Sequence, residues 1–180
     1  MREIELKFKI KDKDKLLNRL DNLDCKIGDL IEQKDTIYVN DLNNIESVEG
    51  SVWLRLRKEQ DNIELNYKKQ SSRKQESKEI EFGVDSYEKA KQFLEELGYK
   101  KWVEVNKKRR YSKYLEYSLC IDEVERLGFF IEIELLVDEK DKNDYIDELI
   151  SVAKVLGLDK QDIINSHYDT MIYELDLREK

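Results

Sequence analysis

Strict alternation of apolar and charged side chains marks the first ten residues of the chain. Ile4, Leu6, Phe8 and Ile10 alternate with Glu3, Glu5, Lys7 and Lys9. Successive side chains of a strand point to opposite faces, so this pattern predicts a β-strand with one apolar and one charged face. Residues 79–82 and 132–135 repeat the pattern Glu-Ile-Glu followed by an apolar residue. The sequence therefore predicts three strands that each carry two glutamates on one face.

The rest of the chain divides into further predicted strands and helices. Period-two alternation predicts strands at 26–40, 51–59, 63–68, 103–111 and 115–124. Apolar residues at helical spacing predict helices at 12–24, 85–97, 144–156 and 166–177. In the second helix, Asp85 is the predicted N-cap, and Ala90, Phe93, Leu94 and Leu97 are the predicted core residues.

Length and composition favour one compact domain spanning residues 1–180. The chain has 180 residues, of which 39% are hydrophobic, and it contains no proline. A chain of this size can bury one substantial core, and it carries no low-complexity linker that would separate two domains.

Charge and rare residues exclude several classes of function. A net charge of −8 argues against a broad basic surface for nucleic acid, although 33 lysines and arginines remain available for a local anion site. No apolar run approaches the length of a membrane span, and the N-terminus has no signal-like apolar segment, so we expect a cytoplasmic protein that does not enter a membrane. Two cysteines and one histidine make a zinc cluster or histidine-based catalysis improbable. Any bound metal would therefore be held by oxygen ligands.

The charged faces of the predicted strands suggest a binding site. If the strands form one curved antiparallel sheet, their apolar faces meet the helices and their charged faces gather together. The acids would be Glu3, Glu5, Glu79, Glu81, Glu132 and Glu134, and the bases would be Lys7, Arg55, Arg57, Lys68 and two of the four residues at 107–110. Crowded carboxylates repel one another unless a cation intervenes, and Mg²⁺ or Mn²⁺ prefers carboxylate oxygens together with phosphate. The pattern is suited to a metal-bound polyphosphate, although a sheet with solvated surface ion pairs would show the same alternation.

Ordered motifs along nearly the whole chain resemble one family. Glu3-Ile4-Glu5-Leu6-Lys7 resembles the ExExK signature of the CYTH superfamily, also called triphosphate tunnel metalloenzymes, which includes class IV adenylate cyclases and thiamine triphosphatases. The resemblance continues through Gln33-Lys34-Asp35, Leu54-Arg55-Leu56-Arg57, Tyr67-Lys68, Lys78-Glu79-Ile80-Glu81, Lys107-Lys108-Arg109, Ile121-Asp122-Glu123-Val124-Glu125 and the run from Leu127 to Glu134. It implies an α+β fold in which a closed antiparallel eight-stranded β-barrel surrounds a triphosphate tunnel, with helices packed outside.

The resemblance also implies a site, position by position. Glu3, Glu5, Glu132 and Glu134 would be metal ligands, and Glu81 and Asp122 would complete or orient the acidic side. Lys7, Arg55, Arg57, Lys68, Lys107 and Arg109 would bind the triphosphate, and Lys7, Lys68 and Arg109 would act in catalysis. Lys107 and Arg109 are preferred to Lys108 and Arg110 because of their spacing after Val105, and a one-residue slip would exchange the two pairs.

Within the superfamily, the sequence resembles the class IV adenylate cyclase branch. Thiamine-triphosphatase-like members usually carry tyrosine two residues after the Asp of the second motif, where this chain has Ile37, and Tyr38 should face the other way. The Asp-Glu-Val-Glu-x-Leu-Gly segment and Ser166-His167-Tyr168 are also similar to the cyclase branch, whereas Arg126 replaces a common glycine. The implied cofactor is Mg²⁺ or Mn²⁺, the partner is a small-molecule triphosphate, and a homodimer is suggested. Thiamine triphosphatase, inorganic or nucleoside triphosphatase and a non-catalytic polyphosphate-binding module remain alternatives, with a purely structural barrel as a further one.

Overall fold

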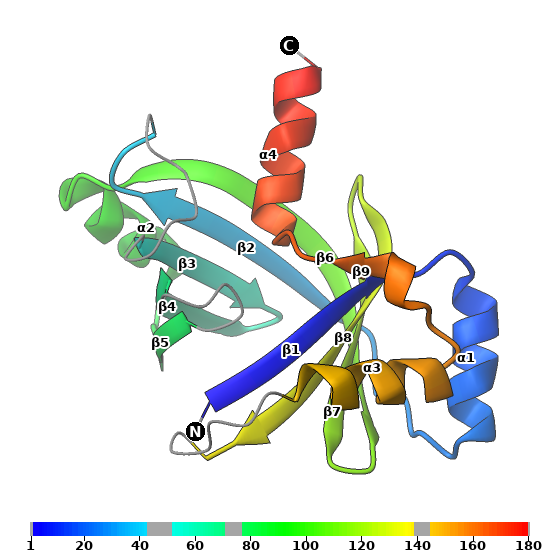
Figure 1. Ribbon diagram of the computed structural model, residues 1–180. Helices are drawn as coiled ribbons and strands as arrows, with labels where there is room; N and C mark the ends of the chain where they lie inside the picture. The colour runs from blue at the N-terminus through cyan, green and yellow to red at the C-terminus, as the bar shows by residue number, and fades with distance from the viewer. Residues whose placement is uncertain (1, 43–51, 71–76, 139–144, 180) are drawn as a thin grey trace. The chain divides into compact units, whose positions relative to one another are not determined.

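The computed structural model describes residues 2–42, 52–70, 77–138 and 145–179 (Figure 1). The strands are β1 (Arg2–Lys9), β2 (Ile31–Val39), β3 (Val52–Glu59), β4 (Asn62–Gln70), β5 (Ser77–Gly83), β6 (Lys100–Tyr114), β7 (Tyr117–Val124), β8 (Gly128–Val137) and β9 (Ile163–Ile164). The helices are α1 (Lys13–Asn22), α2 (Tyr87–Glu96), α3 (Ile146–Val155), α4 (Tyr168–Arg178) and the short 3-10 helix η1 (Lys160–Asp162). The predicted α+β class is confirmed.

The described strands follow the hydrogen-bonded order β5-β4-β3-β2-β6-β7-β8-β1-β9. Every strand of the expected set is present, and the two-residue β9, which was not predicted, pairs with β1. A two-residue strand is too short to produce a recognisable alternation. In the part of the chain that the structure describes, β5 and β9 are the two edges of this order, so the pairings do not include the predicted closure into a barrel.

The chain divides into two compact units that share β6. The first contains Met1–Ile31 and Lys108–Ser166, and the second contains Glu32–Lys107 and His167–Lys180. Each unit has its own part of the sheet and its own helices. The single domain predicted from length remains a prediction.

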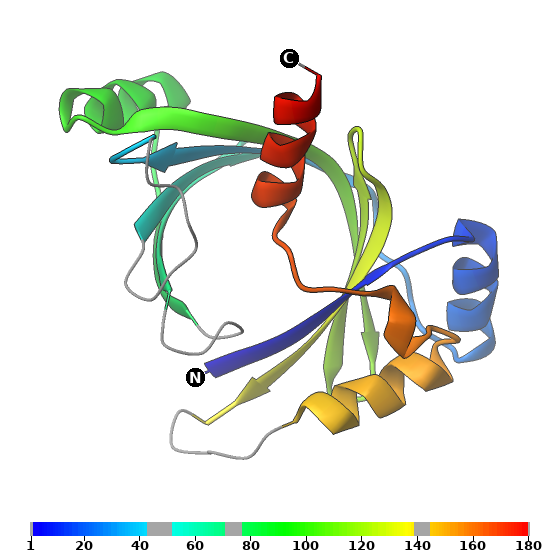
Figure 2. The same ribbon diagram turned by 45° about the horizontal axis from the view of Figure 1, so that its top comes forward.

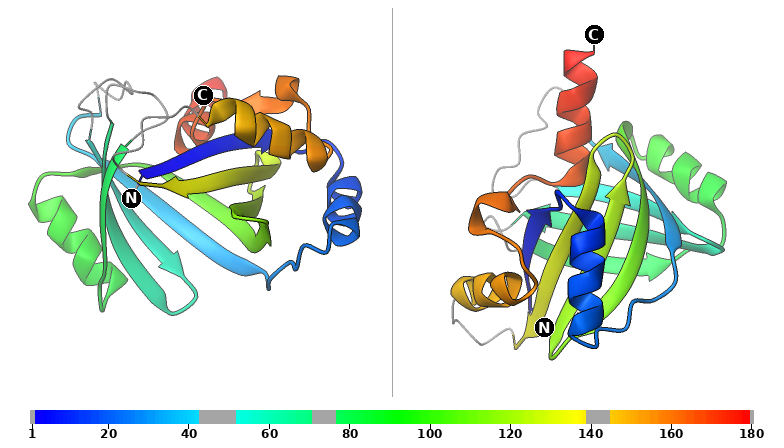
Figure 3. Two further views of the ribbon diagram at one scale, coloured as in Figure 1. Left: turned by 60° about the horizontal axis from the view of Figure 1, so that its bottom comes forward. Right: turned by 90° about the vertical axis from the view of Figure 1, so that its right-hand side faces the viewer.

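In the first unit, α1 and α3 cover the apolar face of β7, β8 and β1 (Figure 3). Figure 2 shows β1 and β8 side by side, with α3 lying along them. The core includes Leu6 and Phe8 of β1, Leu20 of α1 and Leu149 of α3, all of which are buried. Helix α1 begins where Asp12 accepts a hydrogen bond from the backbone N–H of Lys15 at 2.9 Å. Since the helices take the apolar side chains of β1, the charged ones must lie on the opposite face.

In the second unit, α2 packs against β3 (Figure 3). Tyr38, Leu54, Leu56 and Leu65 form the core with Ala90 and Leu94 of α2. The predicted N-cap is off by one residue, because the hydroxyl of Ser86 accepts from the N–H of Lys89 at 3.3 Å. The predicted start of the third helix at Asp144 lies outside the described residues.

Two predicted core residues and two residues on the apolar face of a predicted strand are exposed. Phe93 and Leu97 of α2 are each 58% exposed, and Ile80 and Phe82 of β5 are 52% and 54% exposed. The prediction was wrong because α2 buries only the narrow stripe of Ala90 and Leu94 against the sheet. Strand β5 lies at the edge of the described sheet, where side chains have fewer neighbours.

Strand β6 and helix α4 meet within the second unit through aromatic rings. The rings of Trp102 and Tyr173 lie 5.4 Å apart between centroids and are tilted by 59°. Tyr168, the first residue of α4, is buried. Among the described residues, none of the helices is long and apolar enough to cross a membrane.

Replacement of Leu149 by alanine should destabilise the protein strongly. Its side chain is fully buried against the sheet of the first unit, so the change leaves a cavity and should lower the free energy of unfolding by about 2–5 kcal/mol. Val155→Ala on the same helix is the control, because Val155 is 37% exposed and should cost less than about 1 kcal/mol. Urea denaturation would measure both, and equal losses would contradict the packing of α3 described above.

Candidate functional site

The polar face of the first unit carries rows of side chains that run across neighbouring strands. Glu5 of β1 lies opposite Glu134 of β8, and Lys7 lies opposite Glu132. On the other side of β8, Glu132 lies opposite Cys120 of β7. These positions share one face because residues opposite one another in an antiparallel ladder point the same way. The sequence pattern of β1 and β8 therefore produces a concentrated acidic site.

Three glutamates of this face approach one another closely. Oxygen atoms of Glu3, Glu5 and Glu134 all lie within 4.8 Å of one another. Burial, followed by the charges of Glu3 and Glu132, raises the pKa of Glu134 from 4.5 to about 7. Like charges directly opposite one another destabilise a sheet, and a bound cation would relieve that repulsion.

The donor set of this acidic site fits a hard divalent metal. Mg²⁺ and Mn²⁺ are bound mainly through carboxylate oxygens and water, which is what Glu3, Glu5 and Glu134 offer. Cys120 forms a second close group with Glu132 and Glu134. Sequence reasoning missed Cys120, although its position two residues before Asp122 on β7 places it on the same face.

Glu132 connects the acidic site to two buried cations. Its Oε1 lies 3.3 Å from the Nζ of Lys7, and its Oε2 lies 2.5 Å from the Nη2 of Arg109. Lys7 also donates to the backbone carbonyl of Ser166 at 3.4 Å. Each oxygen of Glu132 thus contacts a different cation, which distinguishes it from Glu134.

Asp122 and Arg109 form a buried two-pronged ion pair. Arg109 donates from Nε and Nη2 to the two carboxylate oxygens of Asp122, at 2.7 and 2.6 Å. Asp122 is fully buried. Burial acts to lower the pKa of Arg109, but the hydrogen bond to Asp122 and the charge of Glu132 outweigh it and raise the pKa well above its ordinary value. In this arrangement Asp122 fixes the orientation of Arg109, whereas its expected role on the acidic side stays a prediction.

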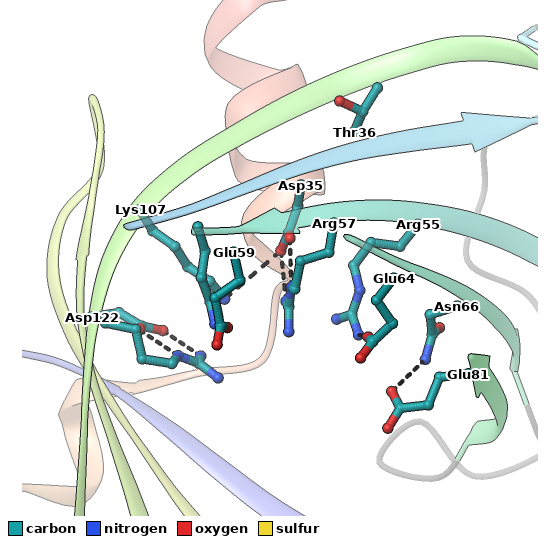
Figure 4. A network of polar contacts seen from close by, with 12 residues as sticks. Asp35, Thr36, Arg55, Arg57, Glu59, Glu64, Asn66, Glu81, Lys107 and Asp122 are labelled. Carbon is teal, nitrogen blue, oxygen red and sulfur yellow. Dashed lines mark hydrogen bonds and ion pairs between the residues drawn. The ribbon is translucent and has the colours of Figure 1, made fainter. Parts of the chain in front are cut away.

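The second unit contains a corresponding pair. Arg57 of β3 lies opposite Asp35 of β2, and its Nε and Nη2 donate to the two oxygens of Asp35 at 2.7 Å each (Figure 4). The Nζ of Lys107 lies 3.9 Å from Oδ2 of the same carboxylate. Burial acts to raise the pKa of Asp35, but the hydrogen bonds from Arg57 and the charge of Lys107 hold it well below its ordinary value.

The remaining polar residues of the second unit lie on β3, β4 and β5. Asn66 donates to Glu79 at 3.0 Å and to Glu81 at 3.3 Å, and Lys68 lies 3.0 Å from Glu79. The Nη2 of Arg55 lies 3.8 Å from Oε1 of Glu64, and Figure 4 shows the two side chains directed toward each other. The Nε of Arg55 is buried and has no hydrogen-bond partner among the described residues. A buried cationic donor without a partner is costly, and an anion would satisfy it.

The structure sorts the predicted residues between the units. Glu3, Glu5, Lys7, Arg109, Asp122, Glu132 and Glu134 belong to the first unit, and Arg55, Arg57, Lys68, Glu81 and Lys107 belong to the second. Glu81, predicted on the acidic side, contacts Asn66 there. On β6, Lys107 and Arg109 are buried whereas Lys108 is exposed. Asp35, Glu64 and Asn66 were not predicted as site residues, although Asp35 falls within a motif that was recognised.

Replacement of Glu134 by glutamine should change the pH dependence of stability in the metal-free protein. Because the folded-state pKa of Glu134 is raised to about 7, the folded protein binds more protons than the unfolded chain between pH 4.5 and 7. Stability from this group is complete below pH 4.5 and is lost as the pH rises through 7. Glu134→Gln should therefore raise the free energy of unfolding at pH 8 and change it little at pH 4.5. Urea denaturation with EDTA would measure it, and an equal change at both pH values would contradict the shift.

Comparison with known proteins identifies the family of this chain. The CYTH domain family matches residues 1–168. A Methanocaldococcus jannaschii protein named "putative adenylate cyclase" is 33% identical over 171 residues, covering 93% of this chain and 97% of the relative. The solved structure of the Pyrococcus horikoshii protein PH1012 has a TM-score of 0.79 at 26% identity and covers 93% of this chain and 98% of that one.

A more distant structure has the same fold. It is a Hippeastrum protein described as a putative adenylyl cyclase with a dominant triphosphatase activity, with a TM-score of 0.61 at 16% identity and coverage of 98% of this chain and 96% of that one. The family match covers residues 1–168, a range that includes Glu3–Lys7 and the acidic and basic side chains described above. The chain belongs to the CYTH family.

Proposed function

We propose that this chain is a divalent-metal-dependent enzyme that converts a small-molecule triphosphate, in the manner of a class IV adenylate cyclase acting on ATP. The observation that carries the proposal is the direct opposition of Glu5 and Glu134, with Glu3 beside them and Lys7 on the same face. Clustered carboxylates of this kind are suited to a metal, and lysines and arginines are suited to the phosphates that such a metal accompanies.

The proposed roles follow the contacts in each unit. Glu3, Glu5 and Glu134 would hold Mg²⁺ or Mn²⁺, with Glu132 beside them, and Glu81 and Asp122 would orient neighbouring polar groups. When bound, the metal would neutralise phosphate charge and stabilise the leaving group. The residues that bind phosphate oxygens would be Lys7, Arg55, Arg57, Lys68, Lys107 and Arg109. The buried Nε of Arg55 supports this role, because a phosphate oxygen would supply its missing acceptor.

In the proposed reaction, the ribose 3′-hydroxyl attacks the α-phosphorus and pyrophosphate leaves. Lys7, Lys68 and Arg109 would stabilise the negative charge that develops on the phosphate oxygens, since fixed cations in a partly dehydrated site act strongly on such charge. Lys7 and Arg109 are buried and are held by Glu132, so they would need little rearrangement.

The second candidate is a triphosphatase of the same superfamily, in which water attacks the terminal phosphorus. The Hippeastrum protein, described as having a dominant triphosphatase activity, favours keeping this candidate. A thiamine-triphosphatase-like arrangement is less well supported, because Tyr38 lies in the apolar core and Ile37 takes the place where such members carry tyrosine. A polyphosphate-binding module without turnover would have little need for the opposed acids.

Family membership also leads us to propose a closed barrel, a homodimer and a cytoplasmic location. The described antiparallel sheet is compatible with the barrel of the family. Cys25 and Cys120 are both free and buried, which suits a reducing compartment.

Phosphorus NMR of the purified protein would test the activity. With ATP and Mg²⁺ we expect cyclic AMP and pyrophosphate, and EDTA should stop the reaction. The same measurement with thiamine triphosphate and inorganic tripolyphosphate would identify a phosphohydrolase by the release of orthophosphate. No conversion of any of the three would contradict the enzyme proposal and favour the binding module.

Replacement of Glu5 or Glu134 by glutamine should reduce metal-dependent turnover by roughly 100-fold or more, about 2.7 kcal/mol in the activation free energy. Each change removes a charged oxygen ligand while preserving the shape of the side chain. Turnover with varied Mg²⁺ would measure the loss. The control is Glu123→Gln, because Glu123 lies on the opposite face of β7 in an exposed ion pair with Lys13 at 3.5 Å. Full activity of the Glu5 and Glu134 variants, together with greater stability, would point to a purely structural cluster.

A further inference from the structure

A single buried carboxylate in the second unit contacts two cations that the proposed function assigns to phosphate binding. Asp35 accepts two hydrogen bonds from Arg57 and lies 3.9 Å from Lys107. All three side chains come from different strands, β2, β3 and β6. Figure 4 shows Arg57 and Lys107 both directed toward Asp35. The carboxylate is thus placed to determine how both cations are presented.

The hydrogen bonds fix the plane of the Arg57 guanidinium. They use Nε and Nη2, each at 2.7 Å from one carboxylate oxygen, and Nη1 takes no part in the pair. Two parallel hydrogen bonds define both the position and the rotation of a planar group, which a single bond does not. The Nη1 end of Arg57 therefore has a defined direction before any ligand binds.

Lys107 is held by groups of two kinds. In addition to the Asp35 carboxylate, its Nζ lies 5.3 Å from the ring centroid of Tyr168, the first residue of α4. A cation over an aromatic face is attracted electrostatically by the ring. Lys107 is 7% exposed, so its long side chain has little freedom to sample other positions.

The first unit uses the same arrangement for another arginine. Arg109 donates through the same two nitrogen atoms, Nε and Nη2, to the two oxygens of Asp122. In both units the carboxylate lies on the strand next to the one that carries the arginine. Both arginines that are held in this way belong to the proposed phosphate ligands. This repetition indicates that the ion pair between Asp35 and Arg57 is not incidental.

We propose that Asp35 is a positioning residue that assembles Arg57 and Lys107 into one preformed phosphate subsite. The inference rests on the proposed function, since it assigns to these two cations a phosphate group of the triphosphate. Without the carboxylate, the guanidinium plane and the ammonium position are no longer fixed, and two neighbouring buried cations repel one another. The subsite would then have to be assembled by the ligand at a cost in affinity.

The test compares the binding of two ligands that differ by one phosphate. Isothermal titration calorimetry with inorganic tripolyphosphate and with pyrophosphate, in EDTA so that no metal-dependent turnover occurs, gives both dissociation constants. The wild-type protein should prefer tripolyphosphate, because the third phosphate occupies a further subsite. Asp35→Asn should reduce this preference about tenfold, the scale of one charge-assisted hydrogen bond.

The ratio of the two dissociation constants distinguishes a poorly positioned phosphate subsite from a partly unfolded protein. Partial unfolding lowers the fraction of protein that binds either ligand, so it changes the stoichiometry and leaves the ratio unaltered. The matched control is Glu104→Gln, because Glu104 pairs with Lys34 at 3.0 Å and Lys101 at 2.8 Å on the face of β6 opposite to Lys107. This control should keep the wild-type ratio.

Two results would overturn the inference in distinguishable ways. An unchanged preference in Asp35→Asn, with a clear preference in the wild-type protein, would overturn the role of Asp35 alone. No preference in the wild-type protein would overturn the proposed function and this inference with it. If Asp35→Asn does not fold, Asp35→Glu decides, because it keeps the charge but displaces the carboxylate. A folded Asp35→Glu protein should show a reduced preference for tripolyphosphate over pyrophosphate. If its preference equals that of the wild-type protein, the proposal is overturned.

Discussion

Buried cations of this protein are held by carboxylates on neighbouring strands. A lysine or arginine that leaves water loses a large solvation energy, and only close pairing with hydrogen bonds offsets the loss. The antiparallel register supplies these partners, since Asp35 lies opposite Arg57 and Glu132 lies opposite Lys7. The polar face of each unit is therefore a network in which no single charge could be moved independently of its partner.

The two ends of this network have opposite character. The charge of Glu132 is neutralised by Lys7 and Arg109. Glu134, two residues further along β8, lies opposite Glu5 and has a raised pKa. Two glutamates of one Glu-Ile-Glu motif thus have different surroundings, one shared with cations and the other with carboxylates. The difference comes from the residues opposite them and not from the motif itself.

The sequence predicted most of the strands and helices because alternation and helical spacing are local properties. The charged face of β1 follows from alternation alone, whereas the choice of Lys107 and Arg109 over Lys108 and Arg110 also needed their spacing after Val105. The partners of Asp35 and Asp122 could not be predicted in the same way, since they depend on which strands lie side by side in the sheet. Ile80 and Phe82 look like core residues in sequence, yet β5 lies at the edge of the described order, and position in a sheet is not a local property.

Strand β6 has a consequence for how this protein could change during evolution. Within β6, Lys107 is the last residue that belongs to the second unit, and Arg109 is the second residue that belongs to the first unit. Both side chains are buried and point to the same side of the strand. Insertion or deletion of a single residue between them would turn one of the two cations to the opposite face while leaving the other in place. Substitutions could therefore adjust the charged residues of either unit separately, but a change of length between Lys107 and Arg109 would be tolerated only where a β-bulge restores the alternation of β6.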